Sequence, residues 1–237
     1  MREELGAGEP STLLGQCQRL FENTYGRRTG VNLEDFVVGS DRYRELASRA
    51  AEGADSEYGE GARFFYCLSG GDLRMAIFYT DELIERLETY DPRRCLGEAN
   101  VLEFVVFLEE LSHALHTSLT FRENRRRLLR ASFLAELEVQ AKIDVFLGLV
   151  FFIQRLEGSG PLSPAARRWI ETSLFDRWAV AYRSPHLARR YALAVELGRR
   201  ATAYLDALPS HSRLAAVRRL RTLSLRGKRR LLEGPPA

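Results

Sequence analysis

Apolar residues recur at helical spacing along most of the chain. The segments with this pattern are 11–26, 41–53, 81–90, 99–119 and 125–157, followed by three more between 161 and 233. Ser11 begins the first segment and Gly26 ends it, while Pro164, Pro185 and Pro209 stand where the last three begin. Capping residues and helix breakers of this kind mark helix ends. The periodicity therefore predicts a mostly helical protein.

A different pattern occupies residues 62–80. Two apolar, aromatic-rich runs flank the tetrad Ser69-Gly70-Gly71-Asp72, which is typical of a hairpin turn. We expect an α+β fold that is mostly α-helical, with a small hairpin or sheet before the helix at 99–119 and a helical C-terminal half. The run GSGP at 158–161 indicates a boundary between an α+β part, 1–157, and a basic helical part, 162–237, although the two could pack as one domain.

Charge is unevenly distributed along the chain. The net charge is +3, but residues 183–237 hold 13 Arg or Lys and 3 Asp or Glu, so this segment carries 13 − 3 = +10 and the remainder 3 − 10 = −7. Three widely spaced cysteines, Cys17, Cys67 and Cys95, form no paired motif, which favours a reducing, cytoplasmic setting. With no run of about 18 apolar residues, no transmembrane segment is expected.

The run VFLEELSHALH at 106–116 places acids and histidines on one helix. Glu109 and His113 are four residues apart, so both can face one cation. Glu110 can reach a metal-bound water, which the ion makes acidic, and can accept its proton as the catalytic base. His116 is seven residues from Glu109, so we place it beside the metal rather than on it. The alternative is that His113 and His116 bind and Glu109 does not.

A further metal ligand is expected from the next helix, around 133–146. Glu138 falls within an apolar stripe, where a carboxylate is costly unless it is paired or binds metal. Glu136 is the second choice for this position. Asp144 is a candidate to orient a ligand histidine through a hydrogen bond.

EELSHALH followed by ELEVQAKID (136–144) resembles the zincin metallopeptidases, particularly the gluzincin and ImmA/IrrE-type arrangement. The resemblance implies a hydrolase for peptide or protein substrates, in which a sheet edge holds the peptide. It makes Glu110 the base, with His113 and Glu138 as ligands of zinc. Glu109 stands where the first histidine of HExxH is expected. Because a carboxylate there makes the site more anionic, harder cations such as manganese are also candidates.

The alternative is a metal-free, non-enzymatic interaction or regulatory protein with the same scaffold. Its binding surface would be the arginine-rich C-terminal segment, made of Arg218, Arg219, Arg221, Arg226, Lys228, Arg229 and Arg230. Such a surface suits nucleic acid or an acidic protein partner. Alternatively, the leucines between these residues dock the helix, and the arginines are solvated or paired. A ferritin-like di-iron site is disfavoured, because Glu110-Leu-Ser-His113 is the one ExxH motif where two are needed.

Overall fold

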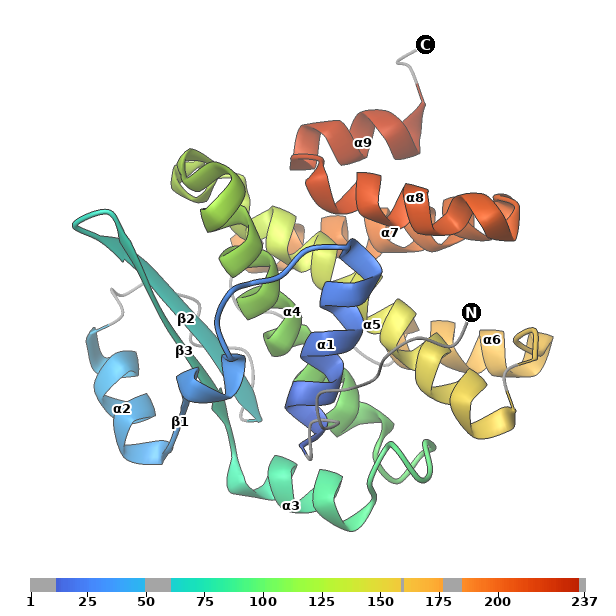
Figure 1. The fold of residues 1–237 in the computed structure, drawn as a ribbon, viewed down its shortest axis with the longest axis horizontal. Coiled ribbons are helices and arrows are strands. Elements are labelled where there is room, and N and C mark those ends of the chain that lie inside the picture. The colour runs from blue at the N-terminus through green and yellow to red at the C-terminus, as the bar shows by residue number, and fades with distance from the viewer. Residues whose placement is uncertain (1–11, 50–60, 159, 177–184, 235–237) are drawn as a thin grey trace.

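The computed structural model describes residues 12–49, 61–158, 160–176 and 185–234 (Figure 1). The first helix, α1, spans Leu13–Tyr25. Thr12 caps it by accepting a hydrogen bond from the Gly15 amide, whereas the predicted cap, Ser11, lies outside the described residues. Gly26 ends the helix in the left-handed conformation, at φ +62°, as its position in the sequence predicted.

A three-stranded sheet follows, in the order β1-β3-β2. β2 (Ala62–Ser69) and β3 (Asp72–Tyr79) form the predicted hairpin, in which Ser69 pairs with Asp72 across the turn. β1 (Val37–Val38) pairs in parallel with β3 and was not predicted, because two residues carry no periodic signal. The short helix η1 (Leu33–Phe36) precedes β1, and α2 (Ser40–Arg49) follows it.

Two long helices form the centre of the molecule. After α3 (Asp81–Thr89), α4 spans Val101–Asn124 and α5 spans Phe133–Glu157, with the short helix η2 (Arg125–Leu129) between them. α4 packs against β2 and β3 on one side and against α5 on the other, while α5 also contacts α7 (Pro185–Ala207). The two central helices are therefore covered on several sides (Figure 1), and polar residues such as His116, Glu136, Glu138 and Asp144 are buried between them and their neighbours.

The C-terminal half is helical, as predicted. It contains α6 (Pro164–Glu171), a π-helical turn η3 (Thr172–Asp176), α7, α8 (Ser210–Thr222) and α9 (Leu225–Glu233). The segment expected to form one last helix is divided after α8, where Ser224 caps α9 by accepting from the Gly227 amide. Among the helices described, none is long and apolar enough to cross a bilayer.

One hydrophobic core joins the two predicted parts of the chain. It runs from Leu14 in α1 through α4 and α5 to Leu220 in α8. Hydrophobic burial of this kind is the main favourable term in folding. The fold is thus α+β and mostly helical, with the small sheet against α4 and the helical C-terminal half against α5.

Candidate functional site

A seam of polar residues runs between α4 and α5. The helices are antiparallel, and their contacts pair Glu109 with Lys142, His113 with Glu138, and His116 with Glu136. Residues three or four apart share a helix face, so successive members of each helix meet successive members of the other. All four predicted residues of the motif helix, Glu109, Glu110, His113 and His116, line this seam or its edge.

The carboxylate of Glu109 forms an ion pair with Lys142, which is not among the predicted site residues. This carboxylate accepts from the ammonium of Lys142, whose side chain is buried. Lys142 lies four residues after Glu138 on α5, so its position beside the expected ligand could have been inferred from helical spacing. Because of this ion pair, Glu109 does not converge with His113 and Glu138 on a common point.

His113 lies between two carboxylates at the edge of the seam. Its Nδ1 is 3.5 Å from Oε2 of Glu110, and its Nε2 is 3.6 Å from Oε2 of Glu138. Burial disfavours a charge here, but the negative charge and hydrogen bonding of Glu138 and Glu110 outweigh it and raise the pKa of His113 to about 10. His113 is therefore an imidazolium at neutral pH.

Glu138 is buried, as its place in the apolar stripe predicted. A second cation reaches it from α7, where a guanidinium nitrogen of Arg190 lies 3.5 Å from Oε1. Burial acts to raise the pKa of Glu138, but His113, Arg190 and Lys142 together lower it. Nothing in the local sequence indicated Arg190, which arrives from 52 positions away in the chain.

Glu136 and His116 form a separate contact, which is more deeply buried than that of His113 and Glu138. Both side chains are 1 % exposed, and Nε2 of His116 lies 3.2 Å from Oε1 of Glu136. Glu136 also pairs with Arg127 of η2 and accepts from the Leu225 amide at 3.1 Å. Burial lowers the pKa of His116 to about 3 although Glu136 opposes it. Glu136 therefore ties η2, α4 and α9 to α5.

Asp144 lies in the interior and contacts neither His113 nor His116. It accepts from the Ser112 hydroxyl at 2.6 Å, from the Gln140 amide at 2.8 Å and from the Tyr25 hydroxyl. Gln140 in turn accepts from the ammonium of Lys228, at 2.7 Å. Asp144 thus belongs to a polar network that connects α1, α4, α5 and α9, and the expected orientation of a ligand histidine is not its role in this arrangement.

The arginine-rich C-terminal residues divide into two groups. Arg221 and Lys228 are buried, whereas five residues are exposed: Arg218, Arg219, Arg226, Arg229 and Arg230. Arg218 donates from Nε to the Thr24 carbonyl at 2.9 Å, and Arg229 pairs with Glu233. The candidate partner-binding surface is consequently smaller than the sequence indicated, because the two buried cations hold α8 and α9 in place.

A cavity of about 700 Å³ opens beside His113. It is bounded by β2, by α2 and by the facing parts of α4, α5 and α7. Phe64 and Tyr66 of β2 face the central helices, where Phe64 packs near His113 and Tyr66 near Phe133. Phe65 faces α2, where it meets Tyr43. Residues from both faces of β2 line the cavity, and Arg74, Met75 and Ala76 of the neighbouring strand β3 line it as well.

The metal predicted from the resemblance can be compared with the donors present. Glu109 is paired with Lys142, Glu138 is shared between His113 and Arg190, and His113 would have to release its proton to bind a metal ion. Among the described residues, no group of three or more His, Cys, Asp or Glu side chains is placed to hold a metal ion. In this arrangement Glu109 and Glu138 are paired with Lys142 and Arg190, and binding of zinc or manganese by Glu109, His113 and Glu138 stays a prediction.

Comparison with protein-family models, with curated proteins and with solved structures gave no significant match. The assignment of function therefore depends on the cavity and on the charged residues around it.

Proposed function

We propose that this protein is a peptide-binding protein, and that an extended acidic peptide segment binds in the cavity beside β2. The observation that carries the proposal is the position of β2, which forms the edge of the sheet among the described residues and lines the cavity from Ala62 to Cys67. An edge strand presents unpaired backbone donors and acceptors to an incoming strand. Strand addition uses these groups for affinity and the flanking pockets for specificity.

The charge around the cavity favours an acidic ligand. Its charged lining consists of the arginines Arg42, Arg49, Arg63, Arg74 and Arg190 and the glutamates Glu110 and Glu138. Arg42 and Arg49 both pair with Glu45, so the five arginines meet three glutamates and leave 5 − 3 = +2, and the imidazolium of His113 adds to this excess. Guanidinium groups bind carboxylates through paired hydrogen bonds. If an extended peptide with acidic residues at alternate positions pairs with β2, all of its acidic side chains point to the same face of the sheet.

The side of the cavity where β2 meets the central helices is apolar and aromatic. Phe64, Tyr66, Leu134 and Leu137 line it beside His113. Leu134 is 46 % exposed, so an apolar side chain of a ligand could pack against it. Alternate side chains of an added strand point to opposite sides, so apolar residues would face this wall while acidic ones face α2.

The proposal can be tested with a fluorescein-labelled decapeptide of alternating glutamate and valine, measured by fluorescence anisotropy at low salt. We expect this peptide to bind. A peptide with lysine in place of glutamate should bind at least about tenfold more weakly, because a loss of about 1.4 kcal/mol in binding free energy already lowers the affinity tenfold. N-methylation of alternate backbone amides preserves the charge but removes strand pairing. It should weaken binding by a similar factor. Equal affinity for the methylated peptide contradicts strand addition.

Protein variants locate the binding site. Arg49→Glu reverses a charge in the cavity, and Arg155→Glu makes the same change at an exposed position near the end of α5. We expect Arg49→Glu to weaken binding of the glutamate peptide by at least about tenfold and Arg155→Glu by less than about twofold. Equal losses in both variants would mean that net charge, rather than the cavity, attracts the peptide.

Metal-dependent hydrolysis stays a prediction of the resemblance and is outside this proposal. The same peptides test it when incubated with zinc or manganese and analysed by mass spectrometry. Cleavage by the wild type that is lost in Glu110→Gln would replace a binding function with a hydrolytic one, since Glu110 is the predicted base.

A further inference from the structure

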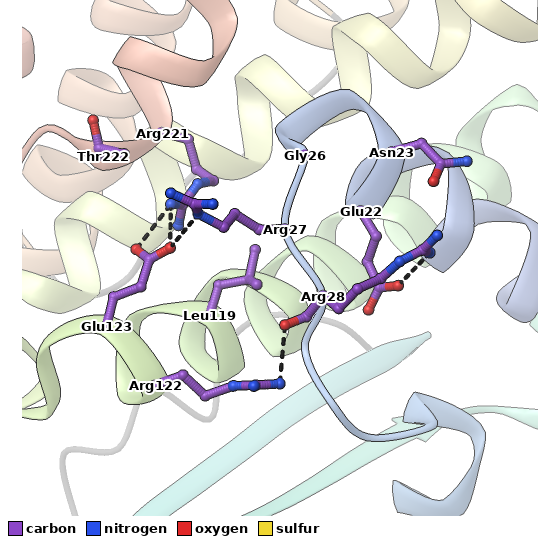
Figure 2. Close-up of a pocket in the computed structure, with 10 residues that line it drawn as sticks. All are labelled: Glu22, Asn23, Gly26, Arg27, Arg28, Leu119, Arg122, Glu123, Arg221 and Thr222. Atoms are coloured by element: carbon purple, nitrogen blue, oxygen red, sulfur yellow. Dashed lines mark hydrogen bonds and ion pairs between the residues drawn. The ribbon is translucent and has the colours of Figure 1, made fainter.

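A second cavity, of about 710 Å³, lies between the loop after α1, the C-terminal half of α4 and the end of α8 (Figure 2). It shares no lining residue with the cavity beside β2. The charged residues that line it are Glu22, Arg27, Arg28, Arg122, Glu123 and Arg221. Four guanidinium groups from three separate segments therefore meet around one space.

The loop that forms one wall is shaped around an arginine. Its ends, Gly26 and Gly30, have φ angles of +62° and +79°, which glycine adopts readily. A Cβ atom at Gly30 would lie 2.0 Å from Nη1 of Arg122, so any other residue there would displace this guanidinium group. Arg122 uses the space to donate to the Arg28 carbonyl at 3.1 Å (Figure 2). The loop thus fixes Arg122 at the cavity.

One of the two glutamates is fully engaged within the loop. Glu22 accepts from the amide and hydroxyl of Thr29, at 2.8 and 2.6 Å, and pairs with Arg28 at 2.9 Å. Burial acts to raise the pKa of Glu22, but the hydrogen bonds from Thr29 and Arg28 lower it. Glu22 is therefore ionised and balances Arg28, and neither contributes net charge to the cavity.

The remaining charges do not balance. The remaining charged residues are Arg27, Arg122 and Arg221 and one carboxylate, Glu123, so the net charge is 3 − 1 = +2. Arg27 and Arg221 meet at Glu123, where Nη2 of Arg221 donates at 2.6 and 2.8 Å (Figure 2). Arg221 is 2 % exposed, yet its Nη1 has no hydrogen-bond partner. A buried donor that stays without a partner destabilises the folded state.

We infer that this cavity binds a small molecule that carries a phosphate group. A phosphate dianion matches the surplus charge, and its three oxygens can accept from guanidinium groups that approach from different segments. Arginine suits phosphate because its planar donors form paired hydrogen bonds. The volume is within the range of small-molecule pockets and exceeds the need of inorganic phosphate alone. An organic group bearing the phosphate would occupy the remainder, beside Leu119.

Calorimetric titration with pyrophosphate at low ionic strength tests this inference, with citrate as a polyanion that lacks phosphate. We expect pyrophosphate to bind at least about tenfold more tightly than citrate. Arg122→Gln should weaken pyrophosphate binding by at least about tenfold, the loss of one charge-assisted hydrogen bond. Gly30→Ala displaces Arg122 without changing any charge and should weaken it as well. Arg155→Gln is the control for net charge, and circular dichroism checks that each variant is folded.

Several outcomes would overturn the inference. They are undetectable binding of pyrophosphate, equal binding of citrate, and equal losses in Arg122→Gln and Arg155→Gln. Binding to vesicles of phosphatidic acid and phosphatidylcholine, without binding of pyrophosphate, would mean that the arginines contact a membrane surface instead. The cavity beside β2 is not involved, so these results are independent of the peptide-binding proposal.

Discussion

Replacing Glu138 with Gln removes one of the two carboxylates that keep His113 protonated. The rise in the pKa of His113 from 6.5 to about 10 corresponds to about 5 kcal/mol of preference for the imidazolium in the folded state, at about 1.4 kcal/mol for each tenfold change in proton affinity. Glu138 contributes more to this preference than Glu110. Its removal should therefore cancel about half or more of it, and lower the pH at which His113 is half-titrated by about 2 pH units.

The measurement is an NMR titration of the histidine ring signals. The chain has 4 histidines, so the signal of His113 can be assigned from the spectrum of His113→Asn. Glu157→Gln, an exposed change at the end of α5, controls for the altered net charge. A wild-type midpoint near 6.5, or an unchanged midpoint in Glu138→Gln, would refute the charge cluster. If the wild-type His113 titrates near pH 6.5 and its titration midpoint shifts when zinc is added, the metal site would be the better explanation.

The same titration has a consequence for stability. Because the folded-state pKa of His113 lies above its unfolded value, its contribution is fully present below pH 6.5 and is lost as the pH rises towards 10. Glu138→Gln should reduce this loss, which urea denaturation at several pH values between 6 and 10 would detect.

Three further predictions concern the interior. Glu136→Gln should destabilise the fold by about 3–5 kcal/mol, because it leaves Arg127 without its buried partner; urea denaturation at pH 7 measures this, and a loss below about 1 kcal/mol contradicts it. Burial lowers the pKa of Lys228 from 10.5 to about 7. Between pH 7 and pH 10.5 the lysine is therefore protonated in the unfolded chain but neutral in the folded one. The stability of the wild type relative to Lys228→Met should then increase as the pH rises from 7 to 10.5. A constant difference across that range argues against a buried lysine. Gly198→Ala should lower the thermal midpoint, because the new Cβ would lie 2.9 Å from Cβ of Lys142 and overpacking costs about 1–3 kcal/mol, more than the roughly 1 kcal/mol gained in helix propensity. An unchanged or raised midpoint would mean that α5 and α7 separate at little cost.

The rarity of lysine in this chain could have indicated two buried cations from the sequence. Lys142 and Lys228 are the only lysines in a chain with 35 lysines and arginines, and both are buried. Each delivers one ammonium to one partner: Glu109 for Lys142 and Gln140 for Lys228. A lysine within an apolar helix pattern, as Lys142 is, is a reasonable candidate for an interior ion pair, because burial of a charge is costly without a partner.

Local sequence determined the helices, the hairpin and the burial of Glu138. These features depend on residues within about one turn of helix or one tight turn of chain, and periodicity reports them directly. The same reasoning placed His113 and Glu138 on facing helices, where the structure brings them within 3.6 Å.

Tertiary structure decided which partners the charged residues find. Glu109 pairs with Lys142 because α4 and α5 are antiparallel in one particular register, and Glu138 meets Arg190 because α7 packs against α5. The cavities arise in the same way, where strand, loop and helices from distant parts of the chain meet. Helical spacing fixes which residues share a face, but it carries no information about the face opposite. A buried charge is neutralised by whichever group the packing brings there.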